Sequence, residues 1–258
     1  MGKDGVLENV DSSVAKSVAT GGIAKRENKM FPGQELSPGM KIDVVCWPEQ
    51  EDHYMAYLPE MDKLYIFGGA YDEVEKGNLS IVGLGEVHEL DHAAYFRLHG
   101  NQQSEVGSVV MNLVSAQDDV KQMFKEFVEA LYSRPGADYL EMHRYGNDQV
   151  KIEHDRLKPG LKDDRFLDIE VGDKGVQRVY LGLVLTELFA YMEMGSHPEF
   201  CDEQTLESIG ADKLVALATD FKNRVGDERT FKNMLANNSS LGQGRQVKDI
   251  SGFLLTTG

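Results

Sequence analysis

The longest nearly continuous apolar run in the chain, residues 176–194, constrains the fold more than any other segment. Its apolar residues surround the helical wheel, which is typical of a helix buried on most sides and not of an amphipathic surface helix. Arg178, Glu187 and Glu193 interrupt the run, and such charges are rare and costly in a segment that faces lipid. We therefore expect this run to form the central core helix of a soluble domain, without a membrane span.

The charge balance limits the possible partners. The chain of 258 residues has 43 acidic and 27 basic side chains, a net charge of −16. A phosphate backbone would be repelled unless the cations gathered on one face, and no such cluster is present in the sequence. We therefore expect no nucleic-acid binding through a basic patch.

The two cysteines, Cys46 and Cys201, are distant in sequence, and the N-terminus lacks the charged and then apolar pattern of a signal peptide. We expect both thiols to be free. The expected location is a reducing compartment, either the cytoplasm or an assembled particle, and not the secretory route.

The composition divides the chain into an arm and a body. Residues 1–39 are rich in Gly, Ser, Ala and Lys and poor in large apolar groups, so they cannot bury enough surface to fold alone. We expect a flexible or partner-bound arm, followed by one α+β domain over residues 40–258. Its possible subdivisions are a β-rich part (40–115), a mainly helical part (116–235) and a tail (236–258).

The body is predicted to be β-rich first and helical later. Short β-type runs separated by turns occupy residues 41–47, 54–58 and 63–67, and residues 79–84 and 106–114 are further candidates. They favour an antiparallel meander or small barrel over residues 40–115. Apolar stripes at helical spacing then predict amphipathic helices from about 115 to 132 and from 212 to 224.

One motif carries specific chemistry. The residues His88-Glu-Leu-Asp-His92 satisfy HExxH, in which a helix turns two histidines toward one Zn²⁺ and the glutamate polarises the water on the metal. Over these five residues the chain resembles the signature of zincin-type metallopeptidases. The resemblance implies that His88 and His92 are zinc ligands and that Glu89 is the general base.

The third ligand of such a site is open. A metzincin would continue with Gly at position 95 and His at position 98, whereas this chain has Tyr95 and Leu98, with His99 one place later. We therefore take His99 as one candidate. A gluzincin would take a glutamate from a following helix, for which Glu126 and Glu129 are candidates by position.

The motif fits two secondary structures. As a helix, the stretch places His88, His92 and His99 within about 40° of one another. As a strand, it alternates apolar and polar side chains and also accounts for Phe96. The glycines at 83 and 85 are poor helix formers, and Asp91 is charged where a helix would face the core. These features favour the strand.

The sequence supports three functions. The first is a non-enzymatic structural or assembly subunit, such as a virus-particle protein, that contacts homo- or hetero-oligomeric partners through its arm and its tail, where residues 253–255 are apolar. This function requires no cofactor. The alternatives are a zinc-dependent metallohydrolase or peptidase and an acidic inhibitor or immunity-type protein that binds a basic partner. The zinc enzyme requires a helix at residues 86–99, and the assembly subunit predicts a strand there.

Overall fold

The computed structural model describes residues 29–37, 40–47, 54–59, 61–98, 100–134, 166–170, 176–198 and 201–226. Two compact units contain them. The first unit includes the described residues up to 97 and those between 196 and 205, and the second includes those from 98 to 195 and from 206 to 226. Each unit is α+β, which confirms the predicted class.

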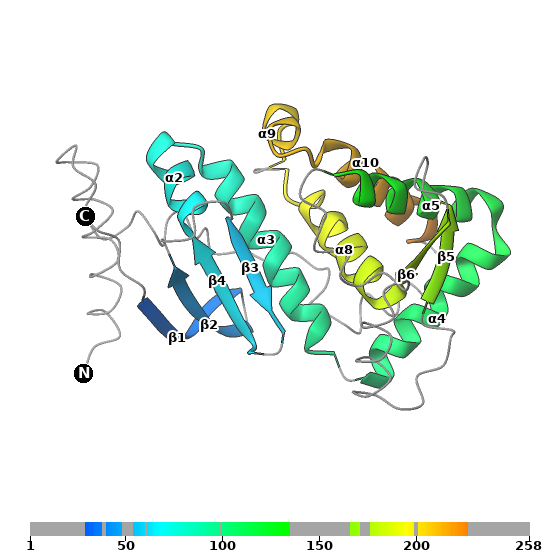
Figure 1. Ribbon diagram of the computed structural model, residues 1–258, viewed down its shortest axis with the longest axis horizontal. Coiled ribbons are helices and arrows are strands. Elements are labelled where there is room, and N and C mark those ends of the chain that lie inside the picture. Colours follow the sequence, from blue (N-terminus) through cyan, green and yellow to red (C-terminus); the bar gives the residue numbers. More distant parts are fainter. Residues whose placement is uncertain are drawn as a thin grey trace. The chain divides into compact units, whose positions relative to one another are not determined.

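The first unit is built on a four-stranded sheet (Figure 1). Its strands are β1 (Lys29–Ser37), β2 (Met40–Trp47), β3 (Met55–Leu58) and β4 (Lys63–Phe67), in the order β1-β2-β4-β3. Strands β1 and β3 run antiparallel to their neighbours, whereas β2 and β4 are parallel. The sheet is therefore mixed, and the expected antiparallel meander or small barrel is wrong, because β2 and β4 pair in parallel and the helices begin at Gly68. Strand β3 forms one edge of the sheet.

Alternation of side chains gives the sheet two different faces. In β2, Met40, Ile42, Val44 and Cys46 are buried on the inner face. The register pairs Val44 with Leu64 and Cys46 with Ile66 of β4, and both β4 residues are completely buried. Strand β3 continues the inner face with Met55 and Tyr57. In β2 and β3 the burial alternates with a period of two residues, as in a strand with one face on the core.

Helices α2 (Gly68–Lys76) and α3 (Leu79–Phe96) follow β4 directly. Helix α2 ends at Gly77, whose φ of +81° is in the left-handed region that glycine adopts without strain. The backbone N–H of Asn78 then bonds to the carbonyl oxygen of Glu73 at 2.8 Å, and the Glu73 carboxylate accepts bonds from Lys76 and from the Asn78 amide. This short connection sets the start of α3.

Helix α3 packs against β3. A Cβ atom added to Gly85 would lie 3.6 Å from the Met55 sulfur, an ordinary contact distance. Eleven residues of α3 are buried, and they lie on nearly all sides of the helix. They include the charged Glu86 and Asp91. The expected strands at 79–84 and 106–114 and the strand interpretation of residues 86–96 are therefore wrong, because these segments belong to α3 and to α4.

The second unit is mainly helical. Its elements are α4 (Gly100–Ala116), α5 (Asp118–Ser133), β5 (Phe166–Glu170), β6 (Val176–Tyr180), α8 (Leu181–Met194) and α10 (Asp212–Val225). Strands β5 and β6 pair antiparallel. The short helix α9 (Glu203–Ser208) lies where the chain passes from the first unit to the second.

The predicted central helix is confirmed as α8, in which twelve residues are buried. The first five residues of the apolar run form β6 instead. Helices α5 and α10 confirm the two predicted amphipathic helices. Phe124 of α5 meets Phe221 of α10 with ring centroids 6.2 Å apart, and Phe127 meets Tyr191 of α8 at 6.1 Å.

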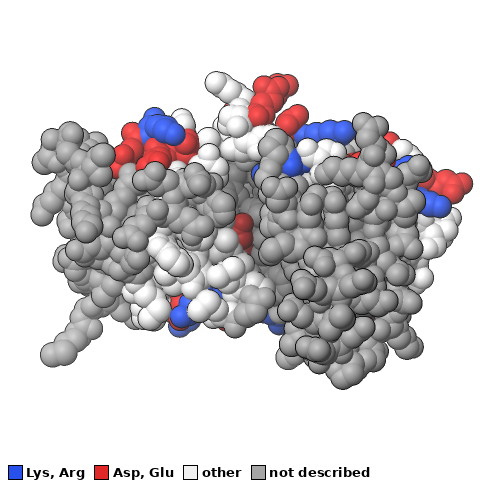
Figure 2. All heavy atoms as spheres, viewed as in Figure 1, with Lys and Arg blue, Asp and Glu red and all other residues white. Residues whose placement is uncertain are grey.

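Several other expectations can be compared with the structure. The segment expected as an arm contains strand β1, while residues 1–28 and the tail after 226 lie outside the described residues. Cys46 and Cys201 do not form a disulfide, as expected. In the described part of the chain, no helix combines the length and the apolar character needed to cross a membrane. On the face drawn in Figure 2, the described acidic and basic side chains are interleaved.

Candidate metal centre

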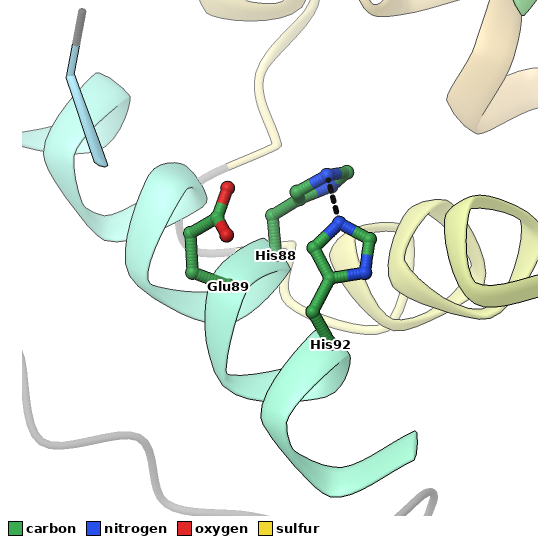
Figure 3. Close-up of side chains that lie close together, drawn as sticks. All are labelled: His88, Glu89 and His92. Carbon is green, nitrogen blue, oxygen red and sulfur yellow. Dashed lines mark hydrogen bonds between the residues drawn. The ribbon is translucent and has the colours of Figure 1, made fainter. Parts of the chain in front are cut away.

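Helix α3 brings the three motif residues together. Four residues along an α-helix correspond to about 6 Å of rise and about 40° of rotation, so His88 and His92 share one face. Glu89 follows His88 by one position and lies beside this face (Figure 3). His92 is buried, with 8% of its surface exposed, whereas His88 and Glu89 are half-buried. The site is thus within reach of solvent without being fully exposed.

The two imidazoles are in direct contact. Their Nε2 atoms lie 2.9 Å apart, and the rings are almost perpendicular, with centroids 4.5 Å apart (Figure 3). A hydrogen bond between two imidazole nitrogens requires one to carry a proton and the other to present a lone pair. The nitrogen lone pair is also what binds a metal ion, so a cation could take the place of the shared proton.

Ligand atoms from His88, Glu89 and His92 all lie within 4.8 Å of one another. In tetrahedral zinc coordination, nitrogens at 2.0–2.1 Å from the metal are about 3.3 Å apart. The observed separation of 2.9 Å would therefore have to open by only about 0.4 Å, which small side-chain rotations supply. Among the described residues, this is the only group of three potential ligand residues gathered in this way.

Glu89 is held by the edge strand of the sheet. Its Oε2 atom accepts the backbone N–H of Tyr57, at 2.7 Å. The short distance is typical of a hydrogen bond to a charged acceptor. The bond fixes the carboxylate between β3 and the histidine pair, and it connects residues that are 32 positions apart in sequence.

Tyr57 belongs to a network at the end of α3. Its hydroxyl donates to Asp62 Oδ1 at 2.8 Å, and Arg97 donates to both Asp62 oxygens, from Nε at 2.9 Å and from Nη2 at 3.1 Å. The Arg97 guanidinium thereby lowers the pKa of Asp62, and the Tyr57 hydroxyl acts in the same direction. Burial, together with the hydrogen bond to Asp62, raises the pKa of Tyr57. The network attaches α3 to the β3–β4 turn.

The other candidate ligands predicted from the sequence are His99, Glu126 and Glu129. His99 lies outside the described residues. Glu126 and Glu129 lie on α5 of the second unit, where Gln122 donates to Glu126 at 2.7 Å and Lys125 pairs with Glu129 at 3.7 Å. Within the described part of the chain, the protein donors gathered at the site are therefore the motif residues alone.

Sequence reasoning missed the part of the site contributed by β3. The donor is a backbone N–H of Tyr57, which carries no residue-specific signal, and nothing in the local sequence indicates its pairing with Glu89. The sequence indicates only that residues 54–58 form a strand and that residues 88–92 form a metal-ligand motif.

Comparisons of the chain with protein-family models, with curated proteins and with solved structures find no match. The function is therefore inferred from the geometry of the site itself.

Proposed function

We propose that this protein is a metal-dependent hydrolase, with His88 and His92 as two ligands of a zinc ion and Glu89 as the general base. The observation that carries the proposal is the close approach of the two Nε2 atoms, 2.9 Å, on one face of α3. The HExxH motif requires a helix for this arrangement, and α3 is a helix over the whole motif.

The chemistry follows from the residue types. A bound zinc ion would act as a Lewis acid on a water molecule and on the substrate carbonyl. A carboxylate within 4.8 Å of the imidazole nitrogens is close enough to accept a proton from a water lying between them. Its bond to Tyr57 keeps it in place, so little reorganisation is needed when the proton moves.

Buried titratable groups add support. Helix α3 carries His92, Glu86 and Asp91, each with at most 8% of its surface exposed. Titratable groups that are buried in this way are enriched at functional sites.

Metal content tests the proposal. The wild type and a His88→Ala/His92→Ala double variant are purified without chelator, supplied with equimolar Zn²⁺, dialysed and assayed by elemental analysis. We expect about one zinc per chain in the wild type and a loss of at least tenfold in the double variant. A His53→Ala/His143→Ala variant, which removes two histidines outside the motif, should keep its zinc.

The variants also separate binding from catalysis. Glu89→Gln should retain zinc and lose hydrolysis of a mixed peptide library by 100-fold or more, since general-base catalysis contributes about 10² to 10⁴. Circular dichroism spectra are compared for all variants, so that unfolding is not mistaken for loss of ligands. A folded wild type that retains no zinc would refute the proposal.

One observation favours assembly as a second candidate function. Exposed large apolar side chains gather on the outer sheet face, which is the face formed by the strand residues that alternate with the inner ones. Trp47, Tyr54 and Leu58 have 43%, 43% and 37% of their surface exposed. The register places Met30, 54% exposed, beside Val45 on the same face, and Met61 in the β3–β4 turn contacts Tyr65.

A face of this kind suits a protein partner or a further subunit. We propose it as the surface through which the chain would act as a structural or assembly subunit. Sedimentation of the wild type and of a Trp47→Glu variant tests this candidate. A wild type that is monomeric at 100 µM and has the same mass as the variant would rule out self-assembly through this face.

A further inference from the structure

An exposed aromatic ring extends the candidate metal site along α3. Phe96 follows His92 by four residues and is rotated by about 40° from it, so that it lies within about 20° of Glu89 on the helical wheel. Its exposed fraction is 39%. Among the large exposed apolar side chains of the described residues, the other five belong to the outer sheet face or its turn, and Phe96 alone comes from α3.

Tyr57 connects the Phe96 ring to Glu89, the proposed general base. The Phe96 ring contacts that of Tyr57, with centroids 6.2 Å apart and planes 31° apart, and it meets Tyr95 edge-on at 5.9 Å. The same Tyr57 donates its backbone N–H to Glu89. One residue of β3 therefore supports both the carboxylate that would receive the proton and the ring beside it.

The charges near this ring are already compensated. Asp62, the carboxylate that Tyr57 reaches, is paired with Arg97 through both oxygens, and Arg97 also donates to the carbonyl oxygen of Lys41 at 2.8 Å. A cationic group approaching Phe96 would compete with Arg97 for Asp62. An uncharged apolar group would only displace water from the exposed ring.

We propose that Phe96 is a specificity-determining residue that contacts an apolar, preferably aromatic, side chain of a peptide substrate. This inference rests on the proposed hydrolase. Phe96 lies about 6 Å along the helix from His92, and an extended peptide advances about 3.3 Å per residue. The contacted side chain should therefore lie within about two residues of the bond that is cleaved.

The test uses the full chain loaded with Zn²⁺ and a library of decapeptides randomised around a central position, with cleavage sites read by mass spectrometry. The wild type and the variants Phe96→Ala, Phe96→Leu and Leu58→Ala are compared. Leu58 is the matched control, because it has a similar exposed fraction, 37%, and lies on the outer sheet face.

We expect the wild type to prefer an aromatic or large aliphatic residue at one position within two residues of the cut. Phe96→Ala should lower kcat/KM for such peptides by about tenfold or more, mainly through KM, because a lost apolar contact typically changes discrimination by 10- to 200-fold. Peptides with a small residue at that position should be cleaved equally by both proteins. Phe96→Leu should retain most of the preference, and Leu58→Ala all of it.

The outcomes separate the two proposals. If the wild type binds zinc and cleaves peptides, but Phe96→Ala has the same selectivity, the inference fails and the hydrolase stands. A preference for Lys or Arg at that position would also overturn it. If the wild type binds no zinc or cleaves nothing, the hydrolase fails and the inference fails with it. Zinc content and Trp47 fluorescence, measured for each variant, exclude loss of metal or of folding as the cause.

Discussion

Removing the Glu89 side chain should destabilise the first unit as well as abolish the proposed chemistry. The carboxylate accepts the backbone N–H of Tyr57 at 2.7 Å, and Tyr57 is buried, with 7% of its surface exposed. Glu89→Ala would leave this N–H without its acceptor, which costs about 1–3 kcal/mol. The better helix propensity of alanine offsets a few tenths of a kcal/mol. We expect a net loss of about 2 kcal/mol.

Glu89→Gln should cost less. Its side-chain carbonyl oxygen can accept the same N–H, but a neutral acceptor forms a bond roughly half as strong as a charged one. We expect a loss of about 1 kcal/mol, so that the two variants differ by about 1 kcal/mol.

Urea unfolding followed by tryptophan fluorescence measures these differences, because the only tryptophan of the chain, Trp47, lies on β2 of the same unit. The m-values should be unchanged, which allows midpoints to be compared directly. Glu75→Ala, which removes an exposed carboxylate on α2, is the control and should stay within about 0.5 kcal/mol of the wild type. If Glu89→Ala also stayed within about 0.5 kcal/mol of the wild type, or if Glu89→Gln were as unstable as Glu89→Ala, the bond to Tyr57 would not have the assigned role.

Three further predictions concern packing and pH. A Cβ atom at position 195 would lie 2.5 Å from Thr219 Oγ1, so Gly195→Ala should cost about 1–3 kcal/mol in urea unfolding; an equal loss in a Thr219→Ala background would contradict this clash. Leu188 of α8 is completely buried, so Leu188→Ala should cost about 2–5 kcal/mol by circular dichroism, and a loss below about 1 kcal/mol would disagree with its core position. Arg97 lowers the pKa of Asp62 below its ordinary value of 3.8, so the pair stabilises the fold above that pH and its contribution disappears as the pH falls through the lowered pKa. The stability difference between the wild type and Asp62→Asn should therefore shrink below pH 3.8, and a difference that stays constant from pH 7 to pH 3 would refute the assignment.

The sequence predicts best those helices that are buried on one side only. In α5, Val120, Phe124, Phe127 and Leu131 are buried and most residues between them are half-buried or exposed, so the 3.6-residue period is visible. Helix α10 has the same property. Helix α8 lacks a stripe but remains recognisable, because it is too long and too continuously apolar for a strand.

Helix α4 was missed because its apolar spacing is ambiguous. Val106, Val110 and Val114 are buried and spaced by four. A spacing of four places residues on one face of a helix and also on one face of a strand, since four is close to one helical turn and is also an even number. The intervening Ser108 and Asn112, both exposed, would share that face in a strand, and they are what identifies the helix.

The same ambiguity applies to His88 and His92, because their spacing of four fits either structure. Helix α3 adds a second difficulty, since burial on nearly all sides removes the amphipathic period that would have identified it. Once the segment forms a helix, the four-residue spacing in the motif is sufficient to bring the two histidines together. The contact of Glu89 with β3 depends on tertiary packing, and no local pattern encodes it.

The two candidate functions use opposite faces of one sheet, so they do not exclude each other. The histidine pair lies on α3, which packs on the inner-face residues Met55 and Tyr57, whereas Trp47 lies on the outer face. Substitutions at one face should therefore leave the other unchanged, because distant sites without shared partners are additive. Measuring zinc content and mass for His88→Ala/His92→Ala, for Trp47→Glu and for the combined variant gives two independent answers. If the loss of zinc also changed the mass, the metal would have a structural role in assembly, and the two faces would not act independently.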